Sequence, residues 1–532
     1  MLVNNLIRVA LALASYTQIA TSIAVVDLGY AKYAGDSLAA GVDQFLGMRY
    51  ARPPIGDLRF RAPQKPQTEF GIKSATQFGK ACIGPGHVPS SSLGEDCLFV
   101  NVFKPSNANK RSKLPVWVYI QGGGYKTNPN TNYNGTKVVV ESSRSIVFVN
   151  FNYRVGPLGF LASQKVKKGD LNAGLLDQRR LLWWVKEHIA KFGGDPGHVV
   201  LHGVSAGGGS ISHHLTAYGA RDDKLFVAAG LQSPFWPTLR TVAESEFQFD
   251  RLVQNTNCAD QKDALACLRS APLAGLINAA VTSPYPGASI LPLPTFYWLP
   301  VIDGDFVRDH LSNLFGSGKF VKVPMLITHT TNEGSEFAYN AKTMWEVQNF
   351  LKNSYPKMTA GELVKVAEAY PLTAPAPYHN AYFPSASGAY GDRTFTCAGN
   401  EVAASVAKFL SSGRVWNYRF NVQDPVNVVI GLGVPHAFDT AAILGVGYGG
   451  IVAESYKTVN AAIIPITMKY WISFIRSLDP NIYRAVGAPV WEPWGTGNGK
   501  RLKLQTNDVK LEAVPPLLTK RCELWKTLSG SR

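Results

Sequence analysis

The strongest constraint on the fold is a five-residue turn at positions 203–207, with the sequence Gly-Val-Ser-Ala-Gly. It follows a strand-like run at 198–202 and precedes small residues at 207–212 that predict the start of a helix. A serine on so sharp a turn has an exposed hydroxyl, and the flanking glycines let neighbouring backbone approach closely. The helix would direct free N–H groups at Ser205. The motif alone also fits an ordinary glycine-rich turn. Other parts of the chain are therefore needed to show whether Ser205 is a nucleophile.

Strands and helices alternate around this turn. The clearest predicted elements are strands at 114–120, 145–151, 198–202, 323–328 and 415–420, and helices at 175–192 and 460–478. Continuous apolar runs such as 114–120 are typical of strands buried on both faces of a sheet. The alternation predicts an α/β fold with a mostly parallel sheet covered on both faces, and mostly helical insertions after the turn, at about 244–374.

The helix at 175–192 has a predicted apolar side. That side consists of Leu175, Leu176, Leu182, Trp183 and Ile189.

The chain has 532 residues, of which 46% are hydrophobic and 17% are charged, enough to bury a large core. We predict a signal peptide at 1–24, with an apolar stretch from 9–14 and a small-x-small site at 22–24. No later stretch is apolar for the roughly 20 residues that span a membrane. No linker or repeat divides the remainder, so we expect one domain at 25–532 in a secreted protein.

The positive charge of the chain is large but scattered. Lysine and arginine total 53 against 37 acidic residues, a net charge of +16 and a pI of about 9.4. Short clusters such as 165–168 do not form a stripe, and no nucleic-acid motif accompanies them. We therefore expect no nucleic-acid partner, while a basic surface of this kind would attract anionic polysaccharides loosely.

Cysteine number and one sequon fit a secretory route. The six cysteines give two local pairs, Cys82 with Cys97 and Cys258 with Cys267, and leave Cys397 and Cys522 for a long-range bridge. Asn134 begins the one N-glycosylation sequon found, although a single sequon also arises by chance.

A serine becomes a good nucleophile when a base takes its proton, and histidine suits that role near neutral pH. Six histidines follow Ser205; His213 and His214 lie on the helix that follows it, and three others lie in or near the helical insertions. His436 follows a glycine-containing loop after the strand at 415–420. Loops at strand ends deliver such a base, so His436 is the candidate.

The base needs an acid that fixes its tautomer and stabilises the imidazolium. Glu333 comes just after the strand at 323–328 and is the first candidate. Glu336 and Asp303 remain alternatives, although Asp303 precedes that strand rather than following it.

Backbone N–H groups are the expected stabilisers of a developing oxyanion. Gly123 and Gly124 follow the strand at 114–120, and Ala206 follows the serine. These three residues are the candidate oxyanion hole.

Several motifs in order resemble the type-B carboxylesterases and lipases, the cholinesterase-like branch of the α/β hydrolases. They lie at 95–101, 122–124, 152–160, 192–196 and 203–207. The likeness covers nearly the whole mature chain and has features of secreted fungal members.

This resemblance implies an α/β-hydrolase fold, a catalytic triad of Ser205, Glu333 and His436, and the three disulfides paired as above. It also implies the structural ion pairs Arg49–Glu95 and Arg154–Asp177. It implies no cofactor and no metal.

The chain departs from the family at three places. Val204 stands where the family usually has Glu, and Gln121 stands where it usually has His. Residues 83–96, between the first two cysteines, contain no Trp, Tyr or Phe, which argues against a choline-stacking site in this loop. In family lipases this loop is a long lid, so its shortness argues for soluble esters.

We therefore predict a secreted serine carboxylesterase that acts on small-molecule esters through an acyl-enzyme on Ser205. Phe296, Tyr297 and Trp298 are candidates to shape the acyl pocket, although core packing explains such aromatics equally well. The alternatives are a triacylglycerol lipase with a preference for interfaces and a non-catalytic adhesion protein of the same family.

Overall fold

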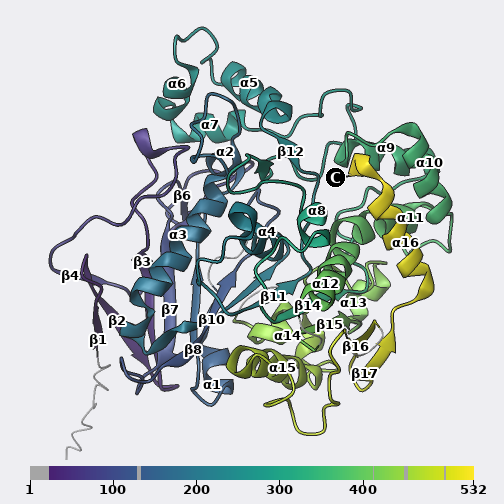
Figure 1. Cartoon of the computed structure of the whole chain (residues 1–532). Coiled ribbons are helices and arrows are strands. Elements are labelled where there is room, and N and C mark those ends of the chain that lie inside the picture. Colours follow the sequence, from purple (N-terminus) through teal and green to yellow (C-terminus); the bar gives the residue numbers. More distant parts are fainter. Residues whose placement is uncertain (1–22, 129–132, 411–412, 449–452, 496–498, 532) are drawn as a thin grey trace, which may run out of the picture.

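A computed structural model describes residues 23–128, 133–410, 413–448, 453–495 and 499–531 (Figure 1). Most of the expected signal peptide, residues 1–22, lies outside the described residues, while Ile23 and Ala24 belong to the first strand. Among the described residues, no helix is long and apolar enough to cross a membrane.

One large sheet organises the chain. The described residues form thirteen strands of this sheet. In spatial order the strands are β1 (Ile23–Asp27), β2 (Lys32–Leu38), β3 (Val42–Arg49), β7 (Phe99–Pro105), β9 (Val147–Phe151), β8 (Leu114–Ile120), β10 (Gly194–Val204), β11 (Ala228–Gln232), β14 (Met325–Thr330), β15 (Val415–Phe420), β16 (Lys500–Leu504) and β17 (Lys510–Ala513), with β4 (Ile72–Ser74) beside β2.

The centre of this sheet is parallel and its margins are antiparallel. Every neighbouring pair from β9 to β16 is parallel. The pairs β1–β2, β2–β3, β3–β7, β7–β9 and β16–β17 are antiparallel, while β4 pairs with β2 in parallel. Since the carboxyl ends of parallel strands meet at one edge, loops that follow β10, β14 and β15 are brought together there.

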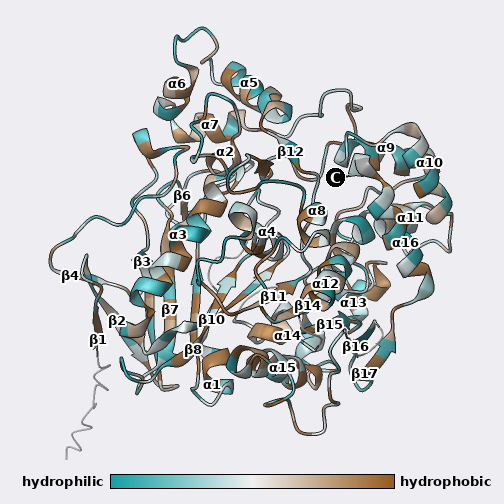
Figure 2. Ribbon diagram, viewed as in Figure 1, coloured by the Kyte–Doolittle hydropathy of each residue, from teal (hydrophilic) through white to brown (hydrophobic). Residues whose placement is uncertain are grey.

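Helices cover both faces of the sheet, as predicted. Alternate residues of β8 divide between them: Val116 and Val118 face one hydrophobic cluster, and Trp117 and Tyr119 face the other. Figure 2 shows the hydrophobic colouring along the central strands. The first face is covered by α3 (Ala173–His188), α4 (Ala206–Ala220), α8 (Leu311–Gly316) and α12 (Cys397–Phe409), and the second by α1 (Thr136–Glu141), α14 (Thr440–Leu444) and α15 (Ile463–Ser477).

A third hydrophobic cluster lies among the helical insertions, above the carboxyl edge of the sheet. Its helices are α2 (Gly156–Phe160), α5 (Glu246–Asn255), α6 (Ala264–Ser270), α7 (Leu273–Ala279), α9 (Met344–Ser354), α10 (Ala360–Ala369), α11 (Phe383–Gly391) and α16 (Pro516–Thr527). Between α11 and α12 the chain makes a π-helical turn, Asp392–Thr396. The short helix α13 (Pro425–Val429) precedes the loop that carries His436.

The remaining described elements are short. They are β5 (Ala81–Cys82), β6 (Leu93–Gly94), β12 (Arg240–Thr241) and β13 (Val301–Ile302), with 3₁₀ turns at Gly56–Leu58, Ile189–Phe192, Ala243–Ser245, Glu454–Lys457 and Ser529–Ser531.

One predicted core residue of α3 was wrong. Trp183 is 37% exposed, whereas its neighbour Trp184 is fully buried and donates its indole N–H to the hydroxyl of Tyr30 at 3.0 Å. Trp184 and Val185 continue the i, i+3, i+4 series from Leu181, and Trp183 falls outside it.

The three predicted disulfides are confirmed. Cys82 pairs with Cys97 and Cys258 with Cys267, each closing a short loop. Cys397 pairs with Cys522 across a separation of 125 residues and attaches α16 to the start of α12.

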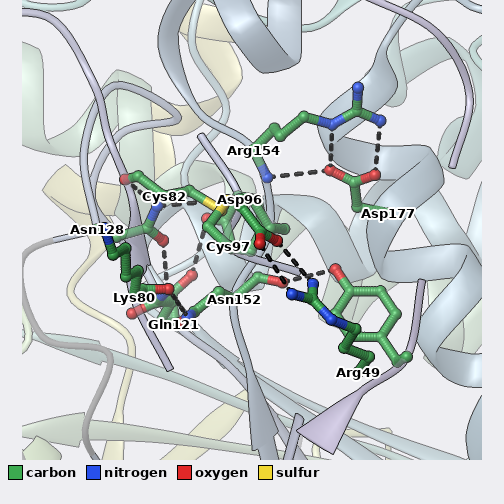
Figure 3. Close-up of a disulfide and its surroundings, with 12 residues drawn as sticks. Arg49, Lys80, Cys82, Asp96, Cys97, Gln121, Asn128, Asn152, Arg154 and Asp177 are labelled. Atoms are coloured by element: carbon green, nitrogen blue, oxygen red, sulfur yellow. Dashed lines mark hydrogen bonds and ion pairs between the residues drawn. A yellow bond between two sulfur atoms is a disulfide. The ribbon is translucent and has the colours of Figure 1, made fainter. Parts of the chain in front are cut away.

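Of the two expected ion pairs, one is confirmed and one was wrong (Figure 3). The guanidinium of Arg154 donates to the Asp177 carboxylate at 2.7 and 2.8 Å, and both side chains are buried. Arg49 pairs with Asp96 at 2.7 Å rather than with Glu95. Glu95 instead accepts two hydrogen bonds from Arg59 at 2.6 and 2.8 Å, because adjacent carboxylates on this loop point to opposite sides.

Buried histidines should make the fold sensitive to acid. Burial lowers the pKa of His213 in α4 to about 3, so the folded protein keeps this ring neutral. In the unfolded chain a histidine takes up its proton at about pH 6.5. Between these values the unfolded state binds more protons, so the free energy of unfolding falls as the pH falls.

We expect His213→Leu to reduce this pH dependence by about 1.4 kcal/mol per pH unit between about pH 6 and pH 4. Chemical denaturation across this range measures it. The control Ile211→Val removes a buried methyl group from the same helix and should lower stability at every pH alike. Equal slopes for the His213 variant and the parent protein would contradict this assignment.

Candidate active site

The turn at Ser205 has the backbone of a strained elbow. Ser205 lies between β10 and α4 with φ 57° and ψ −123°, a conformation that non-glycine residues rarely adopt. Three backbone hydrogen bonds hold it there. The Ser205 N–H donates to the Gln232 carbonyl at 2.9 Å, and its own carbonyl accepts from Gly209 and Phe235 at 2.9 and 3.1 Å.

Both glycines of the motif are required by close backbone packing. A Cβ on Gly203 would overlap the carbonyl oxygen of Gly207, and a Cβ on Gly207 would overlap that of Ile120 at the end of β8. These contacts bring α4 directly against the sheet, so its first turn begins beside the serine.

The loops after β14 and β15 are joined to each other. The Asn332 N–H donates to the Val434 carbonyl at 2.9 Å, and the Val434 N–H donates to the Asn332 side chain at 2.9 Å. These residues are 102 positions apart, and the strands that lead to them are parallel neighbours (Figure 1). This junction places Glu333 opposite His436.

Glu333 and His436 form a buried hydrogen-bonded pair. The Nδ1 of His436 lies within hydrogen-bond distance of Oε2 of Glu333, and the two side chains are 6% and 1% exposed. The other oxygen, Oε1, accepts from the Ser233 hydroxyl at 2.6 Å and from the Thr330 N–H at 2.7 Å. With the carboxylate as acceptor, Nδ1 carries the proton, and Nε2 of the neutral ring is a free acceptor.

Ser205 and His436 line one cavity of about 630 Å³. Nε2 of His436 is buried and has no hydrogen-bond partner among the described residues, the Ser205 hydroxyl included. Catalytic hydrogen bonds are often longer in a protein without substrate than in its complexes. The arrangement therefore supplies a proton acceptor and a hydroxyl in the same cavity, with the acceptor's other nitrogen already fixed.

The candidate oxyanion donors lie beside this serine. Gly123 and Gly124 line the cavity with φ 109° and 61°, values that favour glycine. Ala206 is the first residue of α4, where a helix leaves its N–H groups free of intrahelical partners. A Cβ on Gly122 would lie 2.8 Å from the Cβ of Ser205, so this glycine loop packs directly on the elbow.

The alternative acids occupy other positions. Glu336 lines the cavity, with its side chain exposed and no hydrogen bond to the imidazole. Asp303 accepts from the Asn172 side chain at 2.7 Å and from the N–H groups of Asp305 and Val307 at 2.8 and 3.0 Å, which stabilises a turn. Neither contacts His436 as Glu333 does.

Only one of the three predicted pocket aromatics faces the cavity. Phe296 lines it, and its ring covers Gly124 so closely that a Cβ there would overlap it. Tyr297 and Trp298 are buried in the third hydrophobic cluster, where the Trp298 indole donates to the Ala280 carbonyl at 3.1 Å. Sequence reasoning missed Phe337, which lines the cavity and packs against His436 with ring centroids 5.1 Å apart.

Two of the three departures from the family, Val204 and Gln121, take part in local packing. Val204 lines the cavity. The Gln121 side chain donates to Asn128, which in turn donates to the carbonyls of Cys82 and Tyr153 at 3.0 and 3.3 Å (Figure 3). Gln121 thereby connects the glycine loop to the first disulfide.

A buried polar chain beneath the site was not predicted. The Trp117 indole donates to Nδ1 of His202 at 3.2 Å, and Nε2 of His202 donates to the Gln232 side chain at 3.0 Å. The Gln232 amide donates to Asp439, which also accepts from Tyr418 at 2.6 Å. Burial raises the pKa of Asp439 to about 6 and lowers that of His202 to about 3. This series of hydrogen bonds links β10, the strand before Ser205, to the segment that follows His436.

Ser233, which donates to Glu333, was also missed. It directly follows β11, at the same carboxyl edge as the other site residues. Ser233 follows β11, the neighbour of β14, and this position at the carboxyl end of a central strand could have identified it as a candidate.

Fold and site together define an α/β hydrolase with a serine on a nucleophile elbow. Residues 22–525 match the carboxylesterase family, and the chain belongs to it. It is a carboxylic ester hydrolase, which favours the enzyme over the adhesion alternative.

Three similar proteins come from fungi. The chain is 54% identical to the protein in the crystal structure of Aspergillus niger EstA, with a TM-score of 0.94 over 96% of this chain and 98% of that one. It is 30% identical to secreted lipase 4 of Gibberella zeae, over 89% of this chain and 86% of that protein. It is also 30% identical to lipase 2 of Geotrichum candidum, over 90% and 92%.

Gly207→Ala should disable the site, because the new methyl group would displace the elbow from the Ile120 carbonyl. A displacement of about 1 Å at a catalytic group costs about a hundredfold in rate. Hydrolysis of p-nitrophenyl butyrate, with circular dichroism as a check of folding, measures the loss. The control Gly275→Ala, in α7 with open space around it, should keep full activity. Full activity of the Gly207 variant would show that the packing does not matter.

Proposed function

We propose that the chain hydrolyses carboxylic esters through an acyl-enzyme on Ser205, with His436 as base and Glu333 as its acid partner. The observation that carries this proposal is the fixed orientation of His436. Its Nδ1 is held by Glu333, and its Nε2 is an acceptor with no partner in the described part of the chain, in the cavity that Ser205 lines.

The proposed reaction has two halves. Nε2 of His436 takes the proton of Ser205 as Oγ attacks the ester carbonyl, and Glu333 stabilises the resulting imidazolium. The N–H groups of Gly123, Gly124 and Ala206 stabilise the oxyanion. The imidazolium then returns the proton to the leaving alcohol. In the second half a water molecule loses its proton to Nε2, attacks the acyl-enzyme and releases the acid and the free serine.

The cavity favours esters with apolar groups beside the reacting carbonyl. Phe296, Phe337, Tyr133 and Val204 contribute aromatic and aliphatic walls, while Lys126 and Glu336 place opposite charges on the lining. The loop at 83–96 is closed by the first disulfide and is too short to form a long lid. We therefore propose soluble esters as the substrates, and a triacylglycerol lipase as the second candidate, which the names of the relatives support.

We further propose that the protein is secreted as a single domain, 25–532, after loss of a signal peptide at 1–24. The relative named a secreted lipase and the three disulfides support this route. Asn134 is the proposed glycosylation site. It is half-buried, and its side-chain oxygen accepts from the Thr136 N–H at 2.9 Å.

An organophosphonate ester should label Ser205, because the reagent forms a stable adduct with an activated serine. Peptide mass spectrometry locates the adduct. Ser205→Ala should abolish labelling and lower ester hydrolysis by about four orders of magnitude or more.

Ser335→Ala provides the control, since this hydroxyl lies on the acid loop and donates to the Asn332 carbonyl at 2.9 Å. It should label at the parental rate. Labelling of another serine, or of the Ser205→Ala protein, would overturn the assignment of the nucleophile.

Tributyrin distinguishes the two substrate classes. If soluble esters are preferred, the rate saturates below the solubility limit of tributyrin and does not rise when droplets form. Titration of released acid across that limit measures this. A sharp increase in rate at the limit would establish the lipase instead.

A further inference from the structure

A second hollow lies away from the active site, between the loop at 163–170, the turn at 59–61 that follows the 3₁₀ turn Gly56–Leu58, and the helices α5 and α6. Its volume is about 790 Å³, and it shares no lining residue with the cavity at Ser205. Its lining residues are Arg61, Lys165, Lys167, Asp170, Phe249, Asp250, Val253, Gln254, Ala259, Gln261, Lys262, Asp263, Ala264, Leu265 and Arg269. In Figure 1, α5 and α6 lie at the top of the view.

Five of these lining residues are cations from three separate segments of the chain. They are Arg61, Lys165, Lys167, Lys262 and Arg269. The lysine cluster at 165–168, which looks isolated in the sequence, therefore becomes part of a larger basic surface. The fold concentrates these charges around a concave surface, where their fields add.

Cations outnumber carboxylates in this lining, with five cations beside Asp170, Asp250 and Asp263. None of the five cations forms an ion pair within the described part of the chain. Arg269 donates its Nε–H to the Arg59 carbonyl at 3.1 Å, and Lys165 lies 5.2 Å from the centre of the Phe249 ring. Burial, and then the nearby charge of Arg61, lower the pKa of Arg269, while the carboxylates of Asp170 and Asp263 act in the opposite direction.

Two of the three carboxylates in the hollow are already engaged by the backbone. Asp170 accepts from the Ala62 N–H at 2.7 Å. Asp263 caps α6 and accepts from the Ala266 N–H at 2.9 Å. Each keeps one oxygen that can accept a hydrogen bond from a ligand.

One wall of the hollow is held by a covalent constraint. Residues 259–265 belong to the loop that the Cys258–Cys267 disulfide closes. A wall fixed in this way loses little conformational entropy when a ligand binds.

We propose that this hollow is an accessory binding site for an acidic oligosaccharide, a chain of sugars that carry carboxylates. The five cations would bind the carboxylates, and the free oxygens of Asp170, Asp250 and Asp263 with the amides of Gln254 and Gln261 would bind the hydroxyl groups. Such a site would keep the enzyme on an acidic polysaccharide while the separate cavity at Ser205 acts on esters.

The lining favours a sugar over a nucleic acid. Proteins that bind single-stranded nucleic acids stack bases on exposed aromatic rings. The one aromatic side chain in this lining, Phe249, is fully buried beneath Lys165.

The test measures binding of an unbranched oligogalacturonate to the whole protein by isothermal titration calorimetry at several salt concentrations. The variant Lys165→Gln/Lys167→Gln removes two exposed cations of the hollow, and a second variant, Arg61→Gln, removes a third. The matched control, Lys110→Gln/Arg111→Gln, removes two exposed cations from a turn elsewhere. An uncharged galactan oligomer of equal length is the ligand control.

The double variant in the hollow should weaken binding about tenfold and reduce the dependence of Kd on salt, while the control pair changes Kd by less than about twofold. All variants should hydrolyse p-nitrophenyl butyrate at the parental rate, so failure of this proposal leaves the esterase assignment intact. Equal losses for both pairs, no binding by the parent protein, or tighter binding of single-stranded DNA of equal charge would each overturn the proposal.

Discussion

The backbone conformation at Ser205 is the constraint on which the active site depends. A positive φ at a serine is unfavourable by itself. It persists here because three backbone hydrogen bonds hold the residue and because Gly203 and Gly207 allow the close backbone packing around it. The same contacts fix α4 against the ends of β8 and β11. The position of the hydroxyl, the direction of the helix and the location of the glycine loop therefore follow from one local geometry.

Glu333 and His436 come to the same edge of the sheet as Ser205 through strand order rather than through sequence proximity. Because β11, β14 and β15 are consecutive parallel neighbours, the loops that follow them share one edge with the elbow. Asn332 then joins two of these loops through hydrogen bonds to Val434. These hydrogen bonds between the loops hold the His436 imidazole next to the Glu333 carboxylate.

The sequence predicted features that depend on local pattern or on ordered motifs. The strands at 114–120 and 415–420 have the predicted bounds. The first is a continuous apolar run, and the second places the polar residues Asn417 and Arg419 among apolar ones. Trp183 was wrongly assigned to the buried face of its helix. Two tryptophans are adjacent there, and the sequence pattern did not show which of them faces the core. Arg49 was paired with the wrong carboxylate because two adjacent acids cannot be distinguished without the direction of each side chain.

Side-chain groups that no family motif marks, and that form only where distant segments meet, could not be predicted. Asp439, Gln232 and His202 meet through three different elements, and no single stretch of sequence shows that they form a hydrogen-bonded chain. The basic hollow is similar, since Arg61, Lys165 and Arg269 are ordinary surface cations until the fold collects them. Both depend on packing, which sequence periodicity does not encode.

The disulfide between Cys397 and Cys522 also affects the segment that packs next to Glu333. Cys397 directly follows the π-helical turn, and Gly391 just before that turn packs against Gly334, the residue after Glu333. Closing a loop of this length restricts the unfolded chain strongly. The expression host therefore determines whether this disulfide forms. In a reducing cytosol the C-terminal helix would lack its covalent attachment, whereas an oxidising secretory pathway would supply it.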